Sequence, residues 1–150
     1  MIIGSISENK DIEKRISITP EIAKKYINLG FEVQLISNYG SHLGLDDNDF
    51  IEHGVKIQND EKKIIENSDI IIQMGLLDNE KLSLIKSNQT YIGVLNSFEN
   101  KDKLIELSKK NINVFALELL PRITRAQSMD ILSSQANLAG YKAVIESFSI

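Results

Sequence analysis

The sequence predicts an α/β fold in which an open, mostly parallel sheet carries helices on both faces. Short apolar runs rich in Ile and Val alternate along the chain with segments of helical spacing. Parallel strands need crossover connections, and the helices of those connections cover the faces of the sheet. A length of 150 residues corresponds to one domain. Together these observations favour a Rossmann-like or flavodoxin-like arrangement.

The strands are predicted at short apolar runs in which β-branched residues are frequent. The run 31–36 contains no helix-breaking residue, and Gly75 ends the run that begins at Asp69. In chain order, the predicted strands cover residues 2–6, 31–36, 55–57, 69–74, 90–95 and 113–117.

The first helix has clear signals at both ends. Thr19 is a capping residue, Pro20 is suited to the first turn, and Gly30 ends the apolar pattern. Aspartates at 46 or 47 and at 60 are expected to cap two further helices. The remaining helices are predicted at residues 46–50, 62–67, 79–85, 101–110 and from about 128 to the C-terminus. The face of 101–110 expected to point inward consists of Leu104, Ile105, Leu107 and Ser108.

Composition excludes several classes of function. The net charge of −4 argues against a nucleic-acid surface, and no apolar run has the length of a membrane span. The chain has no cysteine, and His42 and His53 have no partner at metal-ligand spacing, so we expect no metal site. We therefore expect neither nucleic acid nor direct membrane insertion.

A polar stripe in the last third of the chain is the leading site candidate. Amides, hydroxyls and one carboxylate recur there at helical spacing, where a solvated face would normally carry Lys and Glu. The stripe consists of Gln127, Asp130, Ser133, Ser134, Asn137 and Tyr141. The opposite side carries Met129, Leu132, Ala136, Ala139 and Ala143. A weakly solvated surface or a helix-packing seam is the alternative, but the position after the last predicted strand favours a site, because ligands bind beyond the carboxyl ends of parallel strands.

The dinucleotide glycine fingerprint is missing. No Gly-x-Gly-x-x-Gly and no P-loop occurs, so this domain is not expected to cradle a pyrophosphate at a helix start. Residues 144–150 show no helix stop signal, which predicts that the helix pattern continues. Any dinucleotide would be held mostly by another domain.

Four segments resemble one known family. The segment from Arg122 to Tyr141 begins Arg-Ile-Thr-Arg-Ala-Gln-Ser-Met-Asp and looks like the signature of the alpha subunit of proton-translocating NAD(P) transhydrogenase. Residues 13–20 are similar to the family pattern Glu-x-Arg-Val-Ala-x-Thr-Pro. Residues 30–33 and 118–121 match the entry to the second strand and the approach to the signature. The likeness covers essentially the whole chain.

The resemblance implies site residues. It assigns contacts with the nicotinamide end of NAD(H) to five side chains, namely Arg122, Gln127, Asp130, Ser133 and Tyr141. Gln127 is the one given a catalytic part, because it would pair with a ribose hydroxyl and with the partner dihydronicotinamide. Hydride would pass directly between two nicotinamide rings, so no acid, base or nucleophile is required.

The resemblance also implies the wider assembly. The chain would be the N-terminal domain of a two-domain NAD(H)-binding subunit whose Rossmann domain lies downstream. That subunit would work with membrane and NADP(H)-binding components, as a homodimer, in hydride transfer from NADH to NADP⁺ coupled to proton translocation. It would lie in the cytoplasm, on the inner face of the cell membrane through its partners, and the isolated domain is expected to be inactive.

Two other functions stay open on the residues. The first is the substrate domain of an alanine dehydrogenase, a relative that carries a substrate lysine after its fourth main strand and a histidine after its fifth. The corresponding places here are residues 73–75 and Asn96, with neither a lysine nor a histidine. The second is a protein-docking domain without ligand chemistry. Arg15 is expected to pair with Glu8 or Glu13 rather than to clamp a ligand.

Overall fold

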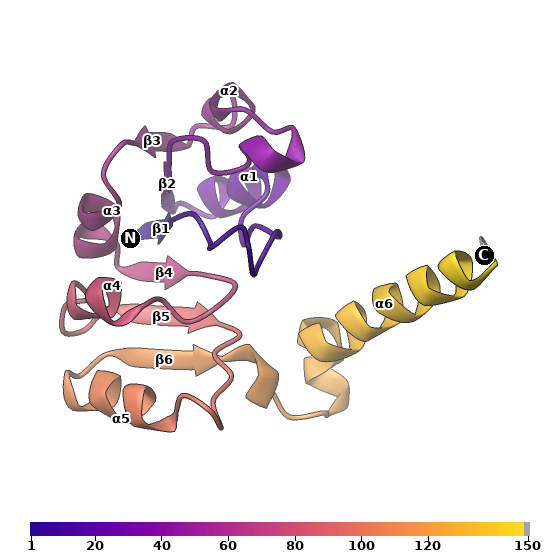
Figure 1. Cartoon of the computed structure of the whole chain (residues 1–150). Coiled ribbons are helices and arrows are strands. Elements are labelled where there is room, and N and C mark those ends of the chain that lie inside the picture. The colour runs from indigo at the N-terminus through magenta and orange to yellow at the C-terminus, as the bar shows by residue number, and fades with distance from the viewer. Residues whose placement is uncertain (149–150) are drawn as a thin grey trace.

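Six parallel strands form a single sheet in the order β3-β2-β1-β4-β5-β6 in the computed structural model, which describes residues 1–148 (Figure 1). Every neighbouring pair in the sheet is parallel. The strands are β1 Ile2–Ser5, β2 Glu32–Ile36, β3 Lys56–Gln58, β4 Ile70–Ile72, β5 Thr90–Gly93 and β6 Asn113–Ala116. All six predicted strands are therefore confirmed, each slightly shorter than or shifted from its predicted range.

Helices connect the strands as the capping signals predict. They are α1 Pro20–Asn28, α2 Asp47–Ile51, α3 Glu61–Asn67, α4 Asn79–Ser83, α5 Lys101–Lys109 and α6 Ile131–Ser147. Three 3-10 segments are added at η1 Ser41–Leu43, η2 Leu117–Leu119 and η3 Thr124–Met129. The Thr19 hydroxyl accepts from the backbone of Ile22, and Asp46 forms a capping box with Asp49. Asp46 is therefore the cap of α2, and Asp47 is its first residue.

The strand order reverses at β1, which has β2 on one side and β4 on the other. Right-handed crossovers then place α1 and α2 on one face of the sheet and α3, α4 and α5 on the other. Apolar side chains from both layers fill the core, among them Ile3, Val33, Phe50, Ile65 and Tyr91. The predicted open α/β sheet is confirmed, and the reversal marks the sheet edge at which such folds bind ligands.

One prediction about α5 is wrong. Leu107 is buried and Leu104 is partly buried, but Ile105 and Ser108 are exposed. The helix packs beside β6, an edge strand with neighbours on one side only. A narrow apolar stripe on α5, formed by Leu104 and Leu107, is therefore enough to cover this edge strand.

The last helix departs most from the prediction. It begins at Ile131, capped by Asp130, so Gln127 and Met129 belong to the preceding 3-10 segment η3 and not to one continuous helix. No described residue of α6 is buried, including Leu132 on the side expected to pack. Figure 1 shows α6 projecting away from the carboxyl ends of the strands. Residues 149 and 150, where the predicted helix would continue, lie outside the described residues.

A glycine in β5 allows this strand to approach the backbone at the end of β4 closely. A Cβ built on Gly93 would lie 2.6 Å from the backbone oxygen of Gln73. We expect Gly93→Ala to lower the free energy of unfolding by about 1–3 kcal/mol, because backbone must shift to make room. Urea unfolding measures this. Gly140→Ala is the control, since its Cβ would meet no atom within 4 Å, and an equal loss in both variants would contradict the explanation.

Candidate functional site

Residues of the predicted stripe gather around one cavity beside the start of α6. The cavity has a volume of about 360 Å³. It is lined by Arg122, Ile123, Thr124, Gln127, Asp130 and Ser133. Four of the five residues predicted to bind a cofactor therefore share one cavity, although they come from η3, its flanks and the first turn of α6. We call it the signature cavity.

Asp130 organises the signature cavity. Its Oδ1 accepts from the backbone N–H of Ser133 at 3.0 Å, and its Oδ2 accepts from the Ser133 hydroxyl at 2.7 Å. The Nε of Arg122 lies 4.0 Å from the same Oδ2. The Ser133 hydroxyl bond, the Ser133 backbone bond and the charge of Arg122 lower the pKa of Asp130. The group is thus a carboxylate at neutral pH, with donors of Arg122 beside it.

Gln127 offers its amide to the signature cavity. It lies on η3, which is anchored by the buried Ala126 and by a bond from the Ala126 N–H to the Ile123 carbonyl. Within residues 1–148 the Gln127 side chain makes no hydrogen bond, and it is exposed. An uncommitted amide donor and acceptor can therefore meet a ligand there.

Tyr141 lies outside the signature cavity. It is 69% exposed and sits eight residues after Ser133 on α6, which corresponds to about 12 Å along the helix axis. The structure therefore does not bring it to the other four residues. Ser134 is turned back on its own helix, where its hydroxyl donates to the carbonyl of Ile131.

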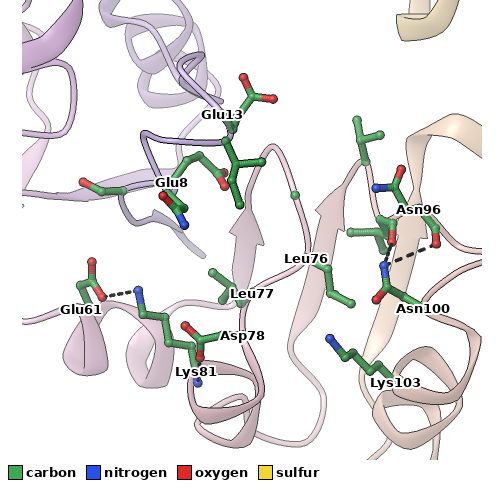
Figure 2. A pocket seen from close by; sticks show the side chains of 16 residues that line it. Glu8, Glu13, Glu61, Leu76, Leu77, Asp78, Lys81, Asn96, Asn100 and Lys103 are labelled. Carbon is green, nitrogen blue, oxygen red and sulfur yellow. Dashed lines mark hydrogen bonds and ion pairs between the residues drawn. The ribbon is translucent and has the colours of Figure 1, made fainter.

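A second and larger cavity lies where the strand order reverses. Its volume is about 630 Å³, and it is bounded by the segments that follow β1, β4 and β5 and by side chains of α3, α4 and α5. Figure 2 shows Glu8 and Glu13 on one side, Lys103 on the other, and Glu61 paired with Lys81 below them. We call it the switch cavity. The sequence did not predict it as a site, although the position of its lining residues after strands β1, β4 and β5 was a signal for it.

A buried glutamine, Gln73, connects the ends of strands β1 and β4 next to the switch cavity. Gln73 is 2% exposed, and its Oε1 accepts from the Ser5 hydroxyl at 2.7 Å and from the Ile6 N–H at 2.8 Å. Its Nε2 donates to the Ile6 carbonyl and to Oε1 of Glu8. Glu8 also accepts from the Met74 N–H, while burial raises the pKa of its carboxyl. The ends of β1 and β4 are thus joined by side chains.

Glu118 joins the ends of β5 and β6 in a similar way. Its carboxylate accepts from the Leu95 N–H, the Ser97 N–H and the Ser97 hydroxyl at 3.1, 2.9 and 2.6 Å. Burial alone would raise the pKa of Glu118, but these hydrogen bonds outweigh it and hold the pKa below the ordinary value of 4.5. The loop after β5 is therefore fixed to the segment that leads into η3.

Glu118→Gln is expected to lower the free energy of unfolding at pH 7 by about 1–2 kcal/mol, because an amide has one acceptor atom where the carboxylate uses two. A lowered folded pKa stabilises the fold above the unfolded value of about 4.5, and this part is lost as the pH falls through the folded pKa. The gap between parent and variant should therefore shrink at pH 3, measured by urea unfolding. The exposed Glu99 of the same loop provides the control, Glu99→Gln. A gap that is independent of pH would refute this account.

Arg15 is committed within the protein. Its Nε and Nη2 donate to the two carboxylate oxygens of Glu13 at 2.8 and 2.6 Å, which confirms Glu13 as its ion-pair partner. The hydrogen bond from Arg15 is the largest cause of the lowered pKa of Glu13. The Nη1 of Arg15 donates to Oε1 of Gln135 at 2.7 Å. Arg15 is therefore not free to clamp a carboxylate ligand in this arrangement.

Two features are absent from residues 1–148. No group of three or more His, Asp or Glu side chains is placed to hold a metal ion. No helix of that part of the chain is long and apolar enough to cross a bilayer. The polar groups that line the signature cavity are those of Arg122, Thr124, Gln127, Asp130 and Ser133.

Comparison with known proteins shows the family of this chain. A model of the family described as alanine dehydrogenase/PNT, N-terminal domain, matches residues 4–139. An NAD(P) transhydrogenase alpha subunit polypeptide of Rickettsia prowazekii is 37% identical over 97% of this chain, and the corresponding polypeptide of Rhodospirillum rubrum is 36% identical over the same share. The chain spans 39% of the length of each.

Solved structures give the same result. The transhydrogenase from Sinorhizobium meliloti superposes with a TM-score of 0.89 at 32% identity, over 97% of this chain and 43% of that one. An L-alanine dehydrogenase shares the fold, with a TM-score of 0.73 at 19% identity over 79% of this chain and 32% of that one. The chain belongs to the alanine dehydrogenase/PNT N-terminal domain family, and its close relatives in both comparisons are transhydrogenases.

Proposed function

We propose that this chain is the first domain of the NAD(H)-binding component of a proton-translocating NAD(P) transhydrogenase. The observation that carries the proposal is the signature cavity, where Arg122, Gln127, Asp130 and Ser133 converge in a chain similar to transhydrogenase alpha subunits. Neutral amides and hydroxyls beside one ion pair suit a carboxamide and a ribose, which need directional hydrogen bonds.

Each side chain has a role that follows from its chemistry. Arg122 donates to the carboxamide oxygen of the nicotinamide, while Asp130, fixed by Ser133, accepts from the carboxamide nitrogen. Gln127 bonds a ribose hydroxyl and meets the nicotinamide ring of the second nucleotide. Tyr141, which lies outside the cavity, supports the surroundings of the site.

The protein contributes position and polarity. Hydride leaves C4 of NADH with its electron pair and is accepted by C4 of the NADP⁺ ring, so one ring is oxidised and the other reduced without a proton donor. Holding two rings at reacting distance accounts for most of the acceleration in such a step. NAD(H) is therefore the cofactor of this component, and NADP(H) belongs to a partner.

The rest of the assembly is proposed on the relatives. They are longer than this chain, and their names describe subunits of a larger enzyme. We propose a downstream Rossmann domain that holds most of NAD(H), a homodimer of complete subunits, and membrane and NADP(H)-binding components that tie it to the inner face of the cell membrane.

Oxidation of an amino acid is less well supported by the switch cavity. A carboxylate substrate would need a clamp of cations there, but Arg15 is engaged by Glu13 and Gln135, and residues 73–75 and Asn96 stand where the dehydrogenases are expected to carry lysine and histidine. Lys103 is the one lysine of the cavity lining without an ion pair among residues 1–148, since Lys81 is paired with Glu61, and the carboxyl group of Glu8 also lines the cavity. The observations therefore favour transhydrogenation.

A chimera tests the proposal. Residues 1–150 replace the matching segment of the Rickettsia prowazekii subunit, which is combined with its partner components. We expect NADH-dependent reduction of an NADP⁺ analogue, and no NADH formation with alanine. The isolated chain should bind NADH too weakly for micromolar titration. Alanine-dependent NADH formation, or a chimera that assembles but transfers no hydride, would overturn the proposal.

A further inference from the structure

We propose that Arg15 is a positioning residue that sets the direction of α6 and, through it, the shape of the signature cavity. The effect on the direction of α6 stands on the contacts of the chain alone. Its consequence for hydride transfer rests on the function proposed above.

The helix α6 has few contacts that could fix its direction. Its 17 residues contain none that is buried. Its other side-chain bonds remain local, from Ser133 to the cap Asp130, from Ser134 to Ile131, from Ser147 to Val144, and between Lys142 and Glu146. The bond from Arg15 to Gln135 is the one side-chain hydrogen bond among residues 1–148 that joins α6 to a segment before β6. Apart from its contact with η2, the projecting helix is therefore tied to the body by this one side-chain bond.

The guanidinium of Arg15 is built as a rigid anchor. Its Nε and Nη2 face both oxygens of Glu13, and the backbone N–H of Arg15 donates to Oε1 of Glu13 at 2.9 Å. A planar guanidinium bound along one edge by two hydrogen bonds leaves Nη1 in a fixed direction, which a lysine ammonium does not reproduce. Nη1 is the atom that reaches Gln135.

The loop that carries Arg15 is itself held in place. The Glu13 N–H donates to the Asn9 carbonyl at 2.8 Å, and a ring nitrogen of His42 lies 2.7 Å from the Lys14 carbonyl. The anchor is thus connected to the body of the domain on both sides. A shift of α6 would require the Arg15 contact to break.

The contact between Arg15 and Gln135 lies on the side of α6 that faces away from the signature cavity. Gln135 lies two residues after Ser133, and residues two apart on a helix point about 200° away from each other. Ser133 faces the cavity, so Arg15 holds the opposite side of the same turn. Fixing Gln135 therefore opposes rotation of α6 about its axis, which would move Asp130 and Ser133 relative to Arg122 and Gln127.

Spin-label distances test the contact in this chain. No native cysteine is present, so Lys24→Cys on α1 and Lys142→Cys on α6 carry the two nitroxides. Double electron–electron resonance should give one narrow distance distribution for the parent. Arg15→Ala and Gln135→Ala should each broaden it at least about twofold, and the double variant should broaden it no further. Circular dichroism checks that helix content is equal.

Three further variants distinguish the loss of the Arg15–Gln135 contact from a general loss of charge or side-chain volume. Lys14→Ala removes a cation from the same loop without touching Gln135 and should leave the distribution narrow. Arg15→Lys keeps the charge but not the fork and should broaden it. Gln135→Glu keeps an acceptor for Nη1 of Arg15 and should leave the distance distribution narrow. A narrow distribution in Arg15→Ala, or additive broadening in the double variant, would overturn the proposal.

The functional consequence is measured in the chimeric subunit. Arg15→Ala should lower kcat for hydride transfer about three- to tenfold and change the KM for NADH less than about twofold, since most of the cofactor is held elsewhere. If Arg15→Ala broadens the spin-label distance distribution but leaves kcat unchanged, Arg15 does not position the site. If the unmodified chimera transfers no hydride, the proposed function fails, while the spin-label distances still decide whether Arg15 directs α6.

Discussion

Replacing Gln127 by asparagine is expected to slow hydride transfer by about 10- to 100-fold in the chimeric subunit. The shorter side chain keeps the amide but moves it by one methylene, and a misplacement of about 1 Å can cost that much in a reaction that depends on orientation. NADH affinity should change less than about twofold, because the signature cavity contacts only one end of the cofactor. Single-turnover kinetics and a separate NADH titration measure the two effects.

The control for Gln127 lies in the same 3-10 segment. Ser128→Ala changes an exposed neighbour that does not line the signature cavity, and its transfer rate should match that of the parent. If Gln127→Asn also transfers at the parent rate, Gln127 has no part in the site. If it lowers NADH affinity in proportion to the rate, its role is binding and not orientation.

Gln73→Met is expected to produce the largest loss of stability among the variants considered. Methionine fills a similar volume but leaves the Ser5 hydroxyl, the Ile6 backbone and Glu8 without the partners that Gln73 gives them. Each unsatisfied buried group costs about 1–3 kcal/mol, so we expect a loss of about 3 kcal/mol or more. For a domain of this size, that lowers Tm by about 6–12 °C.

Strand β2 offers a matched control for Gln73. Gln34 in β2 is 5% exposed, and its side chain makes no hydrogen bond among the described residues. Gln34→Met should therefore leave the free energy of urea unfolding nearly unchanged. Equal losses at the two positions would show that the contacts of Gln73 do not connect β1 and β4 as described.

The sheet could be predicted because its signals are local. Thr19, Pro20 and Gly30 mark the ends of α1 through capping and backbone preferences that need no tertiary partner. Runs of Ile and Val give the strands, and their alternation with helices gives parallel pairing. The order of the strands in the sheet could not be predicted from any local pattern, since it depends on which strands pair with each other in the folded domain.

The signature cavity could be predicted only partially. Its residues were identified by type and by resemblance, but the single helical stripe was wrong, because Asp130 caps a new helix at Ile131 and separates Gln127 from it. The contacts of Gln73 and Glu118 and the bond from Arg15 to Gln135 span 21 to 120 positions in the sequence, so no periodicity reveals them. The exposure of α6 likewise could not be predicted, because it depends on which elements pack against the helix, and the amino-acid composition does not specify that.

A structure of the complete chimeric subunit with NADH bound would locate the nicotinamide ring relative to the signature cavity. We expect the nicotinamide carboxamide to lie in that cavity, within hydrogen-bonding distance of Arg122 and Asp130, with Gln127 at the ribose. A nicotinamide ring in the switch cavity beside Glu8 and Asn96, or away from residues 122–133 altogether, would contradict this expectation.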